Sequence, residues 1–439
     1  MIRPSLVAAW TLVSVLLLTP ASAPAQSSLQ IPLQFDFLNP GAKSKAMGGA
    51  FVGLADDATA TFANPAGLIL IARPELSVEA RHSRLEALFL ERGRLSGTIF
   101  REGTDTVQGP SFGTSVGRDA GIAFVSGVYT APSGRWSAAG YRHELVRVDQ
   151  RFLSNGVFQK APEEFTSRRD TPQEGIRDVS VTGYGATAAY RVGPEVAVGV
   201  GITAYTFSFD SQFRRFDIDG FLGAPNRGVE LGRSTQTGDD TAVAPTVGAL
   251  FGLSGRVRAG VMYRHGPSFT FRTKDGNDPE REGRFRVPHT LAIGASFRPV
   301  PALTLATEVT RVQYSRLRND FVTDQSRAVR READFTIHSG TELHVGVQYL
   351  ATLSHGAPKL RAGAWYDPDH SVRFSPAAPA ASITDRLFDE RLAAALSSGK
   401  SLVHYTGGIG VSLSRRLELN GGFDVTSRSR VISASVVIR

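Results

Sequence analysis

From about Pro74 onward the sequence alternates apolar and polar residues in segments of about ten to twenty residues, separated by clusters of Gly, Asn, Asp, Pro and Ser. The segments Arg256–Arg264, Thr290–Arg298 and Thr341–Tyr349 show this division clearly. A strand between lipid and a polar lumen requires one apolar face and one polar or glycine face. The two faces of Arg416–Thr426 separate completely into Leu417, Leu419, Gly421, Phe423 and Val425 against Arg416, Glu418, Asn420, Gly422, Asp424 and Thr426.

Soluble β-sandwiches also alternate, so the number of strands and the lengths of their connections must decide between the two architectures. Short connections, as at 131–133 and 192–194, alternate with long ones, as at 150–175, 215–239, 274–284, 317–337 and 367–399. This asymmetry is typical of outer-membrane barrels. We therefore predict an all-β fold, an antiparallel transmembrane β-barrel of about fourteen strands over residues 74–439. The strands are expected to begin near residues 75, 119, 134, 176, 195, 240, 256, 285, 302, 338, 358, 400, 416 and 429.

In one long connection the apolar residues recur at the spacing of a helix and not at that of a strand. Ser382–Leu396 places Ile383, Leu387, Leu392 and Leu396 near helical spacing. We expect a short helix there, either as a packing lid or as a groove wall.

The N-terminus is typical of an exported protein. Arg3 precedes the apolar stretch Leu6–Leu18, and a run of small residues follows at Ala21–Ala25. We predict a signal peptide over residues 1–25, with a site after Ala23 as the less favourable alternative because it would place Pro24 first. The absence of cysteine excludes a lipoprotein anchor, a disulfide framework and thiolate metal sites. We expect an outer-membrane location and no cofactor.

The charge of the chain is mildly positive, with 49 Lys and Arg against 41 Asp and Glu, which does not imply nucleic-acid binding. The excess is carried by arginine, which pairs bidentately with phosphate and carboxylate. It fits contacts with lipopolysaccharide, acidic ligands or a polar lumen, and a high-GC genome produces the same bias. Lysine occurs only at Lys43, Lys45, Lys160, Lys274, Lys359 and Lys400.

Residues 26–73 are not strand-periodic and form a separate N-terminal segment. Gly48-Gly49 allows close backbone approach. Asp56 or Asp57 is positioned to cap a short helix through Phe62 or Ala63. The turn Asn64-Pro65-Ala66-Gly67 is expected to end that helix.

These motifs, Gly-Gly-Ala, Ala-Asp-Asp-Ala and Asn-Pro-Ala-Gly-Leu, resemble the N-terminal hatch of the FadL/TodX family of outer-membrane proteins. The resemblance implies a barrel plugged by residues 26–73, a monomer, and uptake of long-chain fatty acids or aromatic hydrocarbons by passive, plug-gated diffusion. It also implies that the ligand leaves sideways through an opening made by a kinked strand. Related barrels serve secretion or surface-assembly complexes, and a scaffold of that kind is the alternative.

Lumenal arginines are the candidate ligand-binding residues, since one could neutralise a carboxylate. Internal ion pairs with Glu342, Glu418 or Asp424 are the competing role. Ser111 and Ser115 lie in strings that fit a nucleophile elbow, but the sequence after them alternates as a strand, so we do not expect an enzyme. The candidate arginines are Arg256, Arg258, Arg264, Arg298 and Arg361.

Overall fold

The computed structural model describes most of the chain from the hatch onward. The predicted signal peptide, residues 1–25, lies outside the described residues. The described residues are 37, 40–94, 109–160, 167–169, 172–218, 227–275, 279–318, 334–352, 357–379, 383–396 and 399–439.

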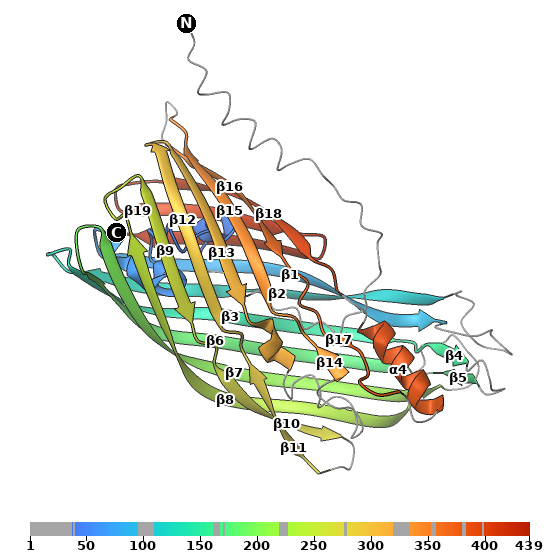
Figure 1. Cartoon of the computed structure of the whole chain (residues 1–439). Coiled ribbons are helices and arrows are strands. Elements are labelled where there is room, and N and C mark those ends of the chain that lie inside the picture. The colour runs from blue at the N-terminus through green and yellow to red at the C-terminus, as the bar shows by residue number, and fades with distance from the viewer. Residues whose placement is uncertain are drawn as a thin grey trace, which may run out of the picture.

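Fourteen antiparallel strands form a closed barrel, as predicted (Figure 1). Each strand pairs with its neighbours in chain order, and the ring closes where β1 pairs with β20. The strands are β1 (Glu75–Gly93), β2 (Pro110–Thr130), β3 (Trp136–Ser154), β6 (Gln173–Arg191), β7 (Val196–Ile218), β8 (Arg227–Phe251), β9 (Val257–Arg264), β12 (Thr290–Val300), β13 (Leu303–Val312), β15 (Gly340–Leu350), β16 (Lys359–Asp367), β18 (Leu402–Ser412), β19 (Leu417–Val425) and β20 (Ser429–Ile438).

The outward face of the barrel is apolar. On β7, Val198, Val200 and Ile202 are 42%, 58% and 58% exposed, while the residues between them face inward. Tyr129 and Trp136 add exposed aromatic rings near the ends of β2 and β3. Exposed apolar side chains at every second position, with aromatic residues at the border, match the lipid-facing band of a transmembrane barrel.

The strands differ in length. The first six barrel strands have 19 to 25 residues and the remaining eight have 8 to 11. Because about 9–11 residues cross a membrane, the first six extend well beyond it at the end where the long connections lie (Figure 1). The prediction of a long loop at 215–239 was therefore wrong: β7 and β8 occupy most of it, and their polar outward residues suit strands that stand in water.

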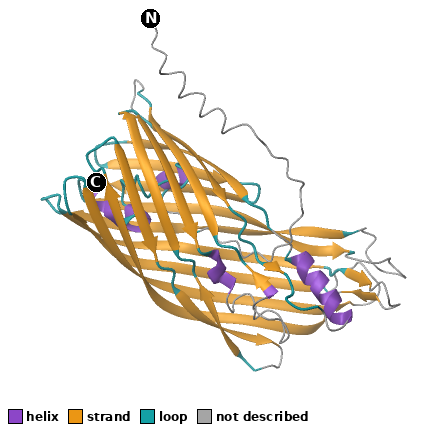
Figure 2. Ribbon diagram, in the orientation of Figure 1, coloured by secondary structure: helices purple, strands orange, loops and turns teal. Residues whose placement is uncertain are grey.

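Smaller elements lie at this projecting end (Figure 2). The predicted helix is present as α4 (Ile383–Ala395). Part of the connection expected at 274–284 is strand, since residues 274–275 belong to β10 and residues 281–284 to β11. The short strands are β4 (Phe158–Lys160), β5 (Ser167–Arg169), β10 (Ser268–Asp275), β11 (Arg281–Arg286), β14 (Phe335–Thr336) and β17 (Arg373–Phe374).

Aromatic side chains fill the interior under the β10–β11 hairpin. Phe207 of β7 stacks on Phe269 and Phe285, with ring centroids 4.9 and 5.2 Å apart. All three rings are buried. The hairpin is therefore packed as part of the barrel interior. Among the described residues, no helix is both long and apolar enough to cross a membrane.

The hatch lies inside the ring of strands, at the end opposite the projecting strands (Figure 2). It comprises α2 (Ala42–Ala46), α3 (Ala60–Ala63) and the 3-10 helix η1 (Pro65–Leu70). α2 contacts β16, β18, β19 and β20, and η1 contacts β2, β3, β6, β7 and β8. The hatch thus touches strands around much of the barrel wall. Most of its side chains, such as Met47, Phe51 and Leu54, are almost fully buried.

Candidate functional site

Buried glutamates of the barrel wall hold the hatch through its backbone amides. They come from β1 and β13 and point into the lumen, where their carboxylates accept hydrogen bonds from hatch N–H groups. Carboxylate acceptors form stronger hydrogen bonds than neutral oxygens do, so these contacts attach the hatch at several separate points. The bonds join Glu79 to Gly41 N (2.6 Å), Glu75 to Ala58 N (2.8 Å), and Glu308 to Phe51 N and Val52 N (2.8 Å each).

A belt of glycines on the inner wall lets the hatch backbone approach the strands. In eight strands, a Cβ added to one lumenal glycine would come within 3.0 Å of a hatch atom. Gly48 meets this belt with φ +65°, and a side chain there would overlap the carbonyl oxygens of Val345 and Ala364. The close approach expected at Gly48 is therefore present. The wall glycines are Gly199, Gly248, Gly260, Gly294, Gly346, Gly363, Gly408 and Gly422.

The Asn64-Pro65-Ala66-Gly67 segment joins two parts of the hatch to the wall. The Asn64 amide donates to Val52 O (2.9 Å) in the hatch and to Ala249 O (3.1 Å) in β8. Its Oδ1 accepts from Ala66 N (3.2 Å), and Pro65 occupies the first position of η1. The expected turn is therefore the start of a 3-10 helix, for which proline supplies a suitable φ.

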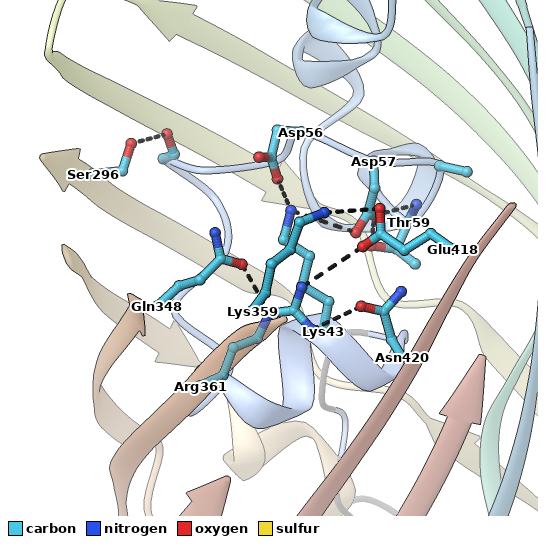
Figure 3. Close-up of polar contacts among 12 residues, drawn as sticks. Lys43, Asp56, Asp57, Thr59, Ser296, Gln348, Lys359, Arg361, Glu418 and Asn420 are labelled. Carbon is cyan, nitrogen blue, oxygen red and sulfur yellow. Dashed lines mark hydrogen bonds and ion pairs between the residues drawn. The ribbon is translucent and has the colours of Figure 1, made fainter. Parts of the chain in front are cut away.

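Asp56 and Asp57 belong to a polar network beside Lys43 of α2 (Figure 3). Asp56 pairs with Lys43 Nζ at 2.5 Å. Asp57 Oδ1 accepts hydrogen bonds from Thr59 N (2.9 Å) and Thr59 Oγ1 (2.5 Å). These contacts occupy both carboxylates, so α3 begins only at Ala60 and neither aspartate caps it. Burial alone would raise the pKa of Asp56, but the charge of Lys43 lowers it below the ordinary value.

Two of the candidate arginines make side-chain contacts within the protein. Arg264 donates to Phe62 O in the hatch (2.5 Å), and its guanidinium lies 3.4 Å from the Phe62 ring centroid. Arg361 donates to Gln348 and Asn420, at 2.8 and 2.7 Å (Figure 3). Arg258 is half-buried, and Arg256 is exposed just before β9. None of these four arginines lines the cavity described next.

A cavity of about 120 Å³ lies between β1 and β3 on one side and β16, β18 and β20 on the other. Lys45 of α2 lines it from the hatch, and Tyr314 lines it from η2 (Tyr314–Arg318). The ring of Trp365 is stacked on His404 at its side, with centroids 3.6 Å apart. The apolar lining residues are Leu85, Leu145, Val146, Val148, Leu402 and Val431.

The barrel wall is interrupted beside this cavity. β2 pairs with β1 along its whole length but with β3 only from Phe124↔His143 to Thr130↔Ser137. Just past the last pair, β3 carries an irregularity between Glu144 and Val146 in its ladder with β6. A bulge of this kind bends a strand and can end its pairing. The unpaired part of β3 contributes residues 144–148 to the cavity, so the cavity reaches the place where the wall lacks ladder hydrogen bonds.

Two groups of site residues were not identified from the sequence. The wall glutamates leave a weak signal, because Glu75, Glu79 and Glu308 are acidic residues on the inward face of otherwise apolar or small strands. Lys45 leaves a clearer one: it and Lys43 are two of only six lysines, and both lie in the hatch.

Comparisons with known proteins identify the fold. No protein-family model and no curated protein matches the sequence. Among solved structures, the chain is similar to a FadL homologue from Pseudomonas aeruginosa, with 12% sequence identity and a TM-score of 0.59 over 94% of this chain and 99% of that one. It is also similar to the toluene transporter TbuX from Ralstonia pickettii, with 13% identity and a TM-score of 0.54 over 92% and 99% of the two chains.

The monoaromatic hydrocarbon channel CymD gives the same result, with 13% identity and a TM-score of 0.54 over 92% of this chain and 98% of that one. The resemblance inferred from the hatch motifs is thus confirmed for the fold. The chain also resembles these proteins in length, since the similarity covers 98–99% of each of their chains.

Proposed function

We propose that this barrel, which has the fold of the FadL-type hydrocarbon channels, carries hydrophobic compounds inward across the outer membrane by passive diffusion. The observation that carries the proposal is that the cavity inside the barrel lies beside the interrupted β2–β3 ladder. Six aliphatic residues line the cavity together with charged side chains such as Arg84 and Glu144, and small-molecule sites combine apolar surface with polar groups that orient the ligand.

In this proposal the cavity binds the hydrophobic compound and lets it pass. The cavity lies next to the hatch, so a ligand that enters from the projecting end meets the plugged part of the barrel. The β2–β3 interruption offers a route from the cavity into the membrane without hatch removal. The outer-membrane location, the monomeric state and the plug-gated mechanism are parts of this proposal. Contact with lipopolysaccharide phosphates, which exposed arginines such as Arg284 and Arg311 would make, stays a prediction.

The test uses two neighbouring positions of β20. Val431 lines the cavity and is 8% exposed, whereas Ile432 faces outward and is 59% exposed. We expect cells that produce the chain to take up a labelled fatty acid or toluene faster than cells without it. Val431→Trp should remove most of this gain by filling the cavity, and Ile432→Trp should retain it.

Equal uptake with and without the chain would overturn the proposal. Stable copurification of the chain with periplasmic or surface proteins, together with unchanged uptake, would favour the scaffold role instead.

A further inference from the structure

We infer that Arg142 of β3 closes the β2–β3 interruption on the side that faces the lipid, and that breaking its contact with β2 limits how fast the hydrophobic compound leaves the barrel. The inference rests on the proposed uptake function and adds to it the residue that controls the exit.

Arg142 lies on the outer face of the barrel. Its neighbours in the chain, Tyr141 and His143, are 8% and 1% exposed and face the lumen, so the residue between them faces outward. Arg142 is paired across the β3–β6 ladder with Tyr184, whose ring is 54% exposed. Directly opposed residues of neighbouring strands share one face of a sheet, which gives Arg142 the same outward orientation.

The position of Arg142 is deep in the membrane. Trp136 begins β3 at the border of the apolar band, and Arg142 is six residues further along the strand. At about 3.3 Å per residue and a tilt of about 40°, this distance advances about 15 Å into an apolar band about 25 Å thick. A charged side chain that faces lipid is most costly near the middle of the bilayer, and such residues usually serve a function.

The guanidinium of Arg142 contacts the end of the broken ladder. Its Nη1 donates a hydrogen bond to the backbone oxygen of Ile122 in β2. Ile122 lies two residues beyond Phe124, which forms the last β2–β3 pair with His143. A backbone carbonyl without a partner is unfavourable in hydrocarbon, so this side chain replaces a donor that the ladder no longer supplies. Because the donor is on a flexible side chain, the bond can break while the paired backbones stay in place.

A second contact closes the interruption on the lumenal side. Arg81 of β1 donates to the backbone oxygen and to Oε1 of Glu144 in β3, at 3.0 and 3.1 Å. Both residues line the cavity. On the intervening strand, Gly121 is paired with Arg81, and a Cβ added to Gly121 would have no atom within 4 Å. The space beside β2 is therefore open at this point, and polar side-chain contacts join β3 to the neighbouring strands across it.

The two contacts have different consequences for a ligand. Arg81 and Glu144 belong to the cavity lining, so changing them would alter binding as well as passage. Arg142 is not part of that lining. Loss of its contact should therefore change the rate of exit and leave the affinity of the cavity as it is.

The experiment measures uptake of labelled naphthalene, a neutral aromatic hydrocarbon, by cells that produce the full chain. Arg142→Met should raise the maximal uptake rate at least about threefold, because a lost hydrogen bond to a charged group shifts an opening equilibrium by about tenfold. Equilibrium binding of naphthalene to the purified protein should stay within about twofold of the wild type.

Two further variants serve as controls. Arg142→Lys retains a donor for the Ile122 carbonyl and should keep the uptake rate within about twofold of the wild type. Arg135→Met removes an exposed arginine just before β3 and should leave uptake unchanged. Heat-modifiable migration on gels checks that each variant is folded.

The outcomes separate this inference from the proposed function. If the wild-type chain gives no uptake above that of cells without it, both fail. If the wild type raises uptake but folded Arg142→Met gives the same rate or a lower one, Arg142 does not close the exit and the uptake function stands. A faster rate that comes with sensitivity to large antibiotics would indicate a displaced hatch and would also overturn the role of Arg142.

Discussion

Among single residues, Gly422 shows how the lack of a side chain lets the hatch pack directly against the barrel wall. It lies on the lumenal face of β19, and a Cβ there would overlap the carbonyl oxygen of Ala42 in the hatch. The next residue, Gly421, has no atom within 4 Å of such a Cβ. The two neighbours therefore differ only in the face of the strand on which they lie, and only Gly422 is required by the hatch.

This difference yields a prediction for matched variants. Gly422→Val should push α2 away from β19, because overpacking costs about 1–3 kcal/mol and shifts the hatch toward displaced positions about tenfold or more. Cells with this variant should become sensitive to large antibiotics that the outer membrane normally excludes. Gly421→Val in the same strand should not change their sensitivity, and equal sensitivity of the two variants would refute the steric role of the glycine belt.

At the scale of elements, the meeting of β2 and β3 is the main departure from a regular barrel. Beyond Phe124↔His143 the two strands are joined by side chains, such as the ion pair between Arg147 and Asp119 at 3.8 Å, and no longer by a ladder. Side-chain contacts of this kind are weaker than a continuous ladder and are screened by salt. The wall is therefore easier to open here than between fully paired strands.

A cross-link across this interruption should block exit of the ligand. The chain has no cysteine, so Asp119→Cys with Arg147→Cys, joined by a short bifunctional thiol reagent, links only these strands. We expect uptake of the labelled hydrophobic compound to fall severalfold after cross-linking. The control is Val125→Cys with Arg142→Cys, a directly opposed pair in the intact ladder. Uptake that is equally reduced in both variants, or in neither, would exclude the β2–β3 opening as the exit.

In the whole molecule, the barrel and the hatch are stabilised by different contacts. The ring closes through ten residue pairs between β1 and β20, none of which involves the hatch. The hatch depends on the wall for its glutamate acceptors, its glycine belt and the burial of residues such as Phe51. It is consequently the part that can move or be removed while the barrel persists.

Deletion of residues 26–73 should therefore leave a folded but leaky barrel. We expect the shortened chain to keep its heat-modifiable migration on gels and to show a large single-channel conductance in planar bilayers, because a fourteen-stranded barrel without a plug leaves an open lumen. The full chain measured in parallel should show little conductance. A deleted chain that folds but conducts no better than the full chain would contradict the plug role.

The architecture of the barrel could be predicted from the order of its residues alone. Alternation at period two follows from the geometry of a strand between two environments, so the strand number and the starts of most strands could be read directly. The hatch motifs were recognisable because Gly48 and Asn64 serve local backbone needs that few other residues meet. The ends of the strands that project from the membrane were predicted wrongly, as at 215–239. In water both faces of a strand can be polar, so its sequence resembles that of a loop.

The contacts of the candidate site could not be predicted in this way, because they form only when the chain is folded. The hydrogen bond from Arg264 to Phe62 and the hydrogen bond from Phe51 to Glu308 join groups that lie more than 200 residues apart in the sequence. The interruption between β2 and β3 likewise depends on register, which a one-residue bulge changes without altering the alternation that the sequence displays. Period and local motif thus specify the barrel and the N-terminal segment inside it, whereas long-range contacts within the closed lumen determine the shape and lining of the cavity.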